Sequence, residues 1–217
     1  MGWGDDFSRR VLVSVDANGY GGPDSRRRYP VQERLSRILD AAAARAGLDR
    51  RRWHRHCGGD RELAVLPASE PEHIAVDAYV RELTMGLTDH NYDLMEGARI
   101  RVRMAVHHGV AIPATNGFAG QGVAVVTRLV DCEPVRNALL AAPGASLVVV
   151  VSGQVFAETV ARRHTTLSPR GFRKVQVRDG GDAWLYVPGF DVHRLDLSGG
   201  QFLSLTRPAP ARASSDW

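Results

Sequence analysis

The sequence predicts an α+β fold with a βαββαβ core in the ferredoxin-like, or palm, order, extended by further C-terminal β, α and β elements. Two observations predict this order. Strand-like runs at residues 10–18 and 98–108 alternate apolar and polar side chains and enclose two helical stretches and a glycine-containing hairpin. After them, the apolar run at 146–152 has the pattern of a strand covered on both faces. The 217 residues are enough for one such domain and a tail.

The first strand, at residues 10–18, ends in a carboxylate and a glycine-rich turn. Strand side chains repeat every two residues, so Val13 and Val15 share one face while Ser14 and Asp16 share the other, more polar face. The glycines of the turn allow backbone N–H groups to approach an anion closely. Asp16 beside such a turn indicates a metal–nucleotide site; the alternative is an aspartate that caps the next turn.

The next elements place a second carboxylate near the first. Apolar positions at three- and four-residue steps predict helices at 30–47 and 70–95, and residues 52–67 between them predict a hairpin around Gly58-Gly59-Asp60. In the ferredoxin-like order, the first and third strands are antiparallel neighbours. We therefore expect Asp60, at the hairpin tip, to lie close to Asp16. The alternative is that Asp60 is only the turn residue of the hairpin.

The later elements complete the sheet. The strand at 98–108 has an apolar face and a charged face with Arg101 and Arg103, which we expect to be open and to need the cover of a second subunit. Helices are predicted at 122–142 and 153–163, and strands at 146–152, 172–177 and 183–187. The composition of residues 191–217, with its proline- and alanine-rich end, predicts a disordered tail.

Composition narrows the possible classes of protein. No apolar run approaches the roughly 18 residues of a membrane span, and the N-terminal residues lack the pattern of a signal peptide, so we expect a cytoplasmic protein without a membrane partner. Cys57 and Cys132 are too few for a disulfide framework and stand in no paired metal-ligand spacing. The net charge of +4 rests on arginine, with Lys174 the only lysine, and this skew does not support nucleic-acid binding.

Two neighbouring carboxylates point to a metal-dependent reaction. Asp16 and Asp60 would repel each other at a few ångströms unless a cation lay between them. Mg²⁺ or Mn²⁺ prefers such oxygen ligands and fills its remaining positions with water and substrate phosphates. In a two-metal site, one ion activates an attacking hydroxyl and the other holds a triphosphate. The pair therefore predicts nucleotidyl transfer from a nucleoside triphosphate.

Four stretches of the chain carry a resemblance to a known family. They are Val15-Asp-Ala-Asn-Gly-Tyr20, Gly58-Gly-Asp-Arg-Glu-Leu-Ala-Val-Leu-Pro67, Ile100-Arg-Val-Arg-Met-Ala-Val-His-His-Gly109 and Gly120-Gln-Gly-Val-Ala-Val-Val-Thr-Arg-Leu129. In this order they resemble the successive motifs of class III adenylate/guanylate cyclase domains, including the bacterial branch with a short loop between the fourth strand and the next helix. The resemblance covers residues 8–190 and implies one cyclase-like domain, with the tail at 191–217 after it.

The resemblance assigns roles to single residues. Asp16 and Asp60 match the metal-binding aspartates of the family, and Arg128 matches the arginine that stabilises the triphosphate in the transition state. In the family this arginine reaches the metal pair from the second subunit, so the resemblance implies a homodimer. Further substrate contacts are expected from the glycine-rich turn, at Asn18, Gly19 and Tyr20.

Three positions depart from the family pattern. The asparagine that orients the ribose, four residues before the arginine, is replaced by Ala124. The lysine that reads the base aligns with His56, which we expect to contact the substrate instead. The residue after the second aspartate is often glycine, and here it is Arg61. These changes imply an altered base choice, weak activity or loss of catalysis.

Three functions remain open at this point. The first is a nucleotide cyclase that forms a 3′,5′-cyclic nucleotide and pyrophosphate. The second is a degenerate cyclase-homology domain that binds a nucleotide or a partner protein, such as a downstream effector. The third follows from Gly58-Gly-Asp-Arg-Glu-Leu63, which resembles the Gly-Gly-Asp-Glu-Phe signature of diguanylate cyclases but is interrupted by an extra residue.

Overall fold

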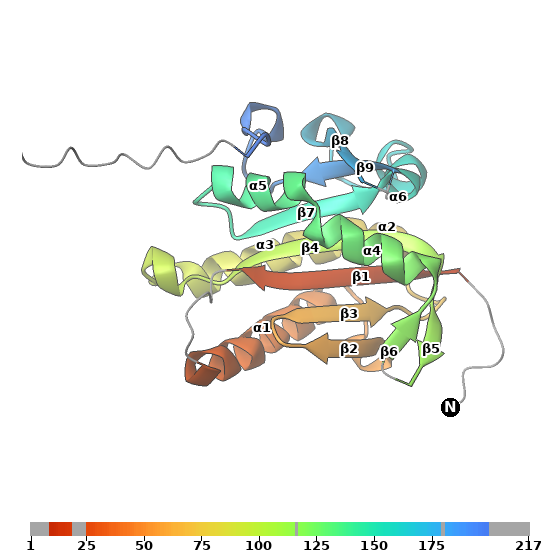
Figure 1. Cartoon of the computed structure of the whole chain (residues 1–217), viewed down its shortest axis with the longest axis horizontal. Helices are drawn as coiled ribbons and strands as arrows, with labels where there is room; N and C mark the ends of the chain where they lie inside the picture. The colour runs from red at the N-terminus through yellow and green to blue at the C-terminus, as the bar shows by residue number, and fades with distance from the viewer. Residues whose placement is uncertain (1–8, 19–24, 116, 179–180, 200–217) are drawn as a thin grey trace, which may run out of the picture.

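The computed structural model describes residues 9–18, 25–115, 117–178 and 181–199; of Asn18 and residues 25–30 only the backbone is described. Figure 1 shows the arrangement of the elements. The strands are β1 (Arg9–Asn18), β2 (His54–Gly58), β3 (Arg61–Val65), β4 (Arg101–Val110), β5 (Ile112–Ala114), β6 (Gly117–Ala119), β7 (Leu147–Ser152), β8 (Arg173–Val177) and β9 (Gly181–Tyr186). The helices are α1 (Ser25–Arg45), α2 (Glu72–Val76), α3 (Ala78–Asn91), α4 (Gln121–Asp131), α5 (Glu133–Ala141) and α6 (Gly153–Val155).

The described strands form a 7-stranded sheet and a separate two-stranded hairpin. The large sheet has the order β2-β3-β1-β4-β7-β9-β8, in which only the β4–β7 pair is parallel. The hairpin pairs β5 with β6. The predicted βαββαβ order is confirmed, and so is the antiparallel pairing of the first and third strands, β1 and β3.

Helices cover both faces of the sheet and produce two apolar clusters. On one face, Val13 and Val15 of β1 pack with Leu39 of α1 and Leu83 of α3. On the other face, Leu12 packs in a cluster with α4 and α5, which Figure 1 shows in front of the sheet, with α3 behind it. This burial on two faces explains why β7 is buried along its whole length, as its continuous apolar run predicts. None of the helices in the described ranges is long and apolar enough to cross a membrane.

Two predicted helices are each divided into two. The helix expected at 70–95 is broken at Asp77, whose carboxylate accepts hydrogen bonds from the backbone N–H and the hydroxyl of Thr166. The helix expected at 122–142 is broken between Asp131 and Glu133, where the chain is extended at Cys132, and Pro134 lies in the first turn of α5. The N–H groups of the first turn have no acceptor within the helix, so proline, which lacks an N–H, loses no hydrogen bond there. Periodicity alone did not reveal either break.

The expectation of an open charged face on β4 is wrong, because α4 and α5 of the same chain cover it. Arg101 donates hydrogen bonds to the carbonyls of Ala145 at 2.9 Å and Ala142 at 2.6 Å, and to that of Leu139. The carbonyls of Leu139 and Ala142 lie at the C-terminal end of α5, where the orphaned acceptors of a helix attract cations, and that of Ala145 lies in the turn after it. Arg101 therefore attaches α5 to the sheet and does not face a second subunit.

The segment after residue 190 is described as far as residue 199. The expected tail begins at 191, but Val192 is buried, and Leu195 and Leu197 pack against the α4–α5 cluster. Arg173 of β8 donates a hydrogen bond of 2.8 Å to the carbonyl of Leu195. Residues 191–199 thus lie against the domain, and the rest of the expected tail, 200–217, lies outside the described residues.

Candidate active site

The end of β1 and the tip of the β2–β3 hairpin meet at one edge of the sheet. Asp16 lies opposite Arg61 in the β1–β3 register, and the backbone N–H of Ala17 donates a 3.0 Å hydrogen bond to the carbonyl of Asp60. Gly59, with φ of +63°, provides the left-handed residue of the turn. The structure thus brings the backbones of Asp16 and Asp60 together, as the predicted topology requires.

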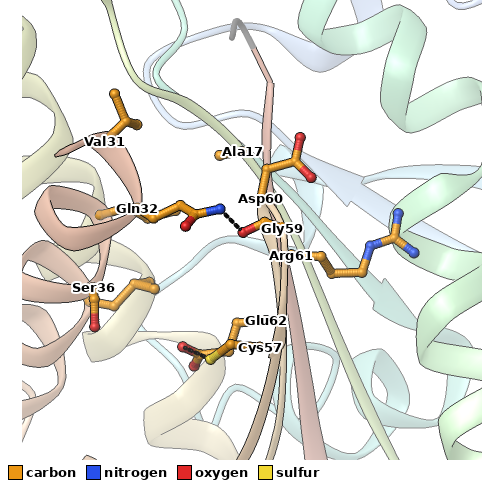
Figure 2. A pocket seen from close by; sticks show the side chains of 11 residues that line it. Ala17, Val31, Gln32, Ser36, Cys57, Gly59, Asp60, Arg61 and Glu62 are labelled. Carbon is orange, nitrogen blue, oxygen red and sulfur yellow. Dashed lines mark hydrogen bonds between the residues drawn. The ribbon is translucent and has the colours of Figure 1, made fainter. Parts of the chain in front are cut away.

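The side chain of Asp60 is exposed at this hairpin tip. Figure 2 shows its carboxylate on the same side of the hairpin as the Arg61 side chain, directed away from Gln32 of α1. Gln32 donates a hydrogen bond to the carbonyl of Gly59, which holds the turn against α1. Asp60 therefore presents its charge near Arg61 and not inside the α1 interface.

Asp16 is almost fully buried, and two arginines neutralise it. Its side chain is 8% exposed, and its Oδ2 atom lies 2.7 Å from Nη2 of Arg61 and 3.1 Å from Nη2 of Arg103. Nη2 of Arg61 also lies 2.6 Å from Oδ1 of Asp131, the last residue of α4. Partial burial of Arg61 opposes its charge, but the hydrogen bonds to Asp16 and Asp131 raise the pKa of its guanidinium. Arg61 therefore stays charged and connects β1 to α4.

Nothing in the sequence indicated Asp131, Arg103 was expected to face a second subunit and its nucleotide, and Arg61 was recognised only as a departure from the family pattern. The β1–β4 register places Arg103 opposite Asp16. A signal for this was available, because both strands alternate and the same-face residues of paired strands are neighbours. No comparable signal indicated Asp131, since it depends on where α4 ends.

The arrangement around Asp16 does not fit a divalent ion as it stands. Its carboxylate charge is already compensated by Arg61 and Arg103, and a metal ion there would lie beside two positive charges. In the part of the chain that the structure describes, no group of three or more histidine, cysteine, aspartate or glutamate side chains is placed to hold a metal. Asp60, which is exposed, remains suited to an ion that arrives with water and phosphate ligands.

The helix α4 carries the other predicted residues. Ala124 and Arg128 are four positions apart, so they lie on one side of the helix, and Asp131 follows within the next turn. Arg128 is exposed and lines a groove of about 550 Å³ together with Asp131, Arg136 and Gln176. Because Arg61 contacts both Asp131 and Asp16, the end of α4 that carries Arg128 lies near Asp16 of the same chain. We call Asp16 and Asp60 the aspartate site.

The remaining predicted substrate contacts are only partly described. His56 is exposed on β2 and shares its sheet face with Ser14, since both lie opposite Leu63 of β3. A Cβ atom at Gly117 would lie 3.0 Å from Cγ of His56, so the imidazole lies against the β5–β6 hairpin. Asn18 ends β1, and Gly19 and Tyr20 lie outside the described residues.

A small cavity of about 140 Å³ lies behind the hairpin, between β2–β3 and α1 (Figure 2). Leu35 and Leu39 line it together with Cys57 and Glu62. Glu62 is bound by Arg50 at 2.6 Å, and the Cys57 thiol lies 3.6 Å from Oε2 of Glu62. Burial and the nearby Glu62 raise the pKa of Cys57, so this thiol is a poor nucleophile.

Comparisons with known proteins agree with this geometry at the level of the fold. No family model and no curated protein sequence matches the chain. Among solved structures, an adenylate/guanylate cyclase/hydrolase from Silicibacter pomeroyi is 19% identical, with a TM-score of 0.58 over 84% of this chain and 99% of that chain. The guanylyl cyclase Cya2 is 16% identical, with a TM-score of 0.56 over 88% of this chain and 97% of that chain.

A third similar structure contains a nucleotide. The guanylate cyclase domain of RhGC from Catenaria anguillulae, solved in complex with GTP, is 15% identical, with a TM-score of 0.52 over 83% of this chain and 96% of that chain. The chain therefore has the fold of adenylate and guanylate cyclase catalytic domains. At such identities the likeness is one of fold alone.

Proposed function

We propose, from this cyclase fold, that the protein converts a nucleoside triphosphate into a 3′,5′-cyclic nucleotide and pyrophosphate. The observation that carries the proposal is the hydrogen bond from Ala17 to Asp60, which fixes two aspartates at adjoining backbone positions on one sheet edge. The catalytic unit is the domain at 8–190, and the reaction takes place in the cytoplasm. A downstream effector protein would respond to the cyclic nucleotide.

The proposed site divides its work among a few side chains. Asp60 would hold Mg²⁺ or Mn²⁺, which supplies a Lewis acid for the phosphates when it is bound, while the expected metal ligand Asp16 stays paired with its arginines. Arg128 balances the charge that develops on the triphosphate, a task suited to a permanently charged guanidinium. The backbone around Asn18, Gly19 and Tyr20 binds phosphate. His56 contacts the base, and Ala124 occupies the position beside the ribose.

The proposal includes a homodimer with two sites. Arg128 is exposed on α4 and can therefore reach a second subunit. The solved guanylate cyclase domain with GTP supports a nucleoside triphosphate as the class of substrate. The covered face of β4 cannot be the interface, so we expect the exposed side of α4 to contribute to it.

A product assay tests the proposal. The protein is incubated with Mn²⁺ and each of the four nucleoside triphosphates, and the products are identified by mass. A cyclic mononucleotide is expected from at least one of them, and Asp60→Asn should lower its formation by about a hundredfold or more, because a metal ligand is lost. Asp60 is preferable to the buried Asp16 for this test, since its exposed side chain can be replaced without disturbing the core.

The control variant for this assay is Asp89→Asn, which changes an exposed aspartate on α3 and should keep full activity. If no variant and no nucleotide gives a cyclic product, the protein is not a cyclase. A cyclic dinucleotide formed from two GTP molecules would indicate the diguanylate cyclase alternative. It differs in mass from a cyclic mononucleotide.

A second candidate function is favoured by specific observations. Arg61 forms an ion pair with Asp16, and Ala124 lacks the amide that would orient a ribose. Both features suit a domain that binds a nucleotide or a protein partner without chemistry. Nucleotide-dependent thermal stabilisation without any product would support this second function.

A further inference from the structure

Asp16 and the three charged side chains around it form a cluster of two positive and two negative charges. Arg61 contacts both Asp16 and Asp131, while Arg103 contacts Asp16 from the neighbouring strand. Arg61 and Arg103 together carry the charge of one divalent ion, and both approach the same oxygen of Asp16. The chain thus places at Asp16 the positive charge that a metal ion would otherwise bring.

The two arginines differ in what they are free to do. The Arg103 side chain is 12% exposed and its Nη2 atom lies 3.1 Å from Asp16, so moving away from Asp16 would leave a nearly buried charge without this partner. Its Nε atom is buried and has no hydrogen-bond partner among the described residues. Buried polar atoms normally have hydrogen-bond partners, so hydrogen bonding alone does not explain why an arginine lies at this nearly buried position. What its position provides is positive charge next to Asp16.

Arg61, in contrast, can exchange partners. Its side chain is 35% exposed, and its second partner Asp131 is 37% exposed at the end of α4. An exposed carboxylate can be hydrated when its arginine leaves, so exchanging Asp131 for a phosphate oxygen disturbs no buried group. Arginine forms paired hydrogen bonds with phosphate as readily as with carboxylate. Arg61 is therefore placed to bridge Asp16 and an incoming triphosphate.

We propose that Arg61 and Arg103 replace one of the two divalent ions of a two-metal nucleotidyl-transfer site, so that this protein binds a triphosphate with a single ion. That ion is held by Asp60 and the phosphates, while Arg61 turns from Asp131 to the triphosphate. This inference rests on the proposed nucleotide site but not on catalysis. It explains why the large Arg61 stands next to Asp60 without excluding the ligand: the guanidinium is itself part of the site.

Counting bound Mn²⁺ tests this proposal. The full chain is titrated with Mn²⁺ in the presence of inorganic tripolyphosphate, which represents the part shared by all nucleoside triphosphates, and protein-bound Mn²⁺ is measured by electron paramagnetic resonance. The unmodified protein should bind one Mn²⁺ per protomer. Arg61→Gln, which removes the charge but keeps a long polar side chain, should bind two, and Arg61→Lys should remain at one.

The matched control is Arg51→Gln, which changes an arginine that is 91% exposed and forms a local ion pair with Asp49; it should also bind one Mn²⁺. Two ions in the unmodified protein, or the same number in the unmodified protein and Arg61→Gln, would overturn the proposal. Circular dichroism of each variant shows whether the substitution has altered the fold.

A second measurement separates this proposal from the proposed function. In the absence of any phosphate, Arg61→Gln should bind Mn²⁺ at least tenfold more tightly than the unmodified protein, because Asp16 is then less compensated. Equal affinities would overturn the role of Arg61 even if tripolyphosphate does not bind. If the ion counts are as expected but no cyclic product forms, the cyclase function fails while the single-ion site stands.

Discussion

Among single residues, Arg61 provides much of the positive charge that compensates the buried carboxylate of Asp16. A buried carboxylate needs compensation, and Arg61 supplies it from the directly opposite position on β3. Removing Asp16 would leave Arg61 and Arg103 without this partner, and breaking a buried ion pair from one side typically costs about 3–5 kcal/mol. Loss of activity in an Asp16 variant would therefore mix folding with chemistry, whereas Asp60 reports on chemistry alone.

The side chain at position 124 should decide how the ribose of a bound nucleotide is oriented. An amide at this position should orient the ribose, so Ala124→Asn should raise kcat by about tenfold or more while changing KM little, because orientation matters most as the ring closes. Steady-state kinetics with the preferred nucleoside triphosphate measures both constants. Ala124→Leu serves as the control without an amide and should show no gain. An unchanged kcat in the asparagine variant of an active protein would reject the proposed role of this position.

At the scale of elements, the position of α4 depends on a close approach between two glycines. A Cβ atom at Gly122 would lie 2.7 Å from the carbonyl oxygen of Val110 and 2.8 Å from the carbonyl carbon of Gly109. Both contacts are with the backbone of β4, which cannot turn aside as a side chain would. The absence of a side chain at Gly122 therefore brings the first turn of α4 against β4.

We expect Gly122→Ala to lower the free energy of unfolding by about 1–2 kcal/mol, because overpacking against backbone should cost about 2–3 kcal/mol and the helix-propensity gain of about 1 kcal/mol offsets part of it. Urea denaturation measures this change. Gly97→Ala is the matched control, because a Cβ atom there has no neighbour within 4 Å, and its effect should stay within about 0.5 kcal/mol. Equal stabilities of the two variants would mean that α4 does not lie this close to β4.

Elements with local sequence signals were predictable, and features that depend on distant residues were not. The alternation in β1 and β4, the apolar run of β7 and the glycines of the hairpin act locally, and the corresponding elements were predicted correctly. The break at Asp77 depends on Thr166, far along the chain, and no local pattern contains it. The error over Arg101 has the same origin: a polar strand face looks open until the helix end that it binds is known.

The candidate site was also predictable only in part. Topology alone brings Asp60 beside Asp16, and the β1–β3 register confirms that adjacency. The ion pairs of Asp16 were not predicted, since they require side-chain directions from three separate elements. Whether Asp16, Asp60 and Arg128 act together in chemistry stays a prediction.

At the scale of the whole molecule, the open question is which chain supplies Arg128 to which aspartates. Within one chain, Asp131 at the end of α4 is joined through Arg61 to Asp16, so Arg128 lies about one turn away from its own aspartate site. The exposure of Arg128 also allows it to reach a second subunit. A site within one chain and a site shared between two chains make opposite predictions when two inactive variants are mixed.

We predict that Asp60→Asn and Arg128→Ala are each inactive and that an equal mixture, after subunit exchange, recovers about one quarter of the parental activity. The reason is that half of the dimers are mixed at random exchange, and each mixed dimer has one of its two shared sites intact. Product formation is measured before and after mixing, with light scattering to confirm the dimer. Two samples of the same variant, mixed in the same way, should recover nothing. If the different variants also recover nothing although mixed dimers form, each chain uses its own Arg128, and the helix end that Arg61 attaches to Asp16 belongs to the site of the same protomer.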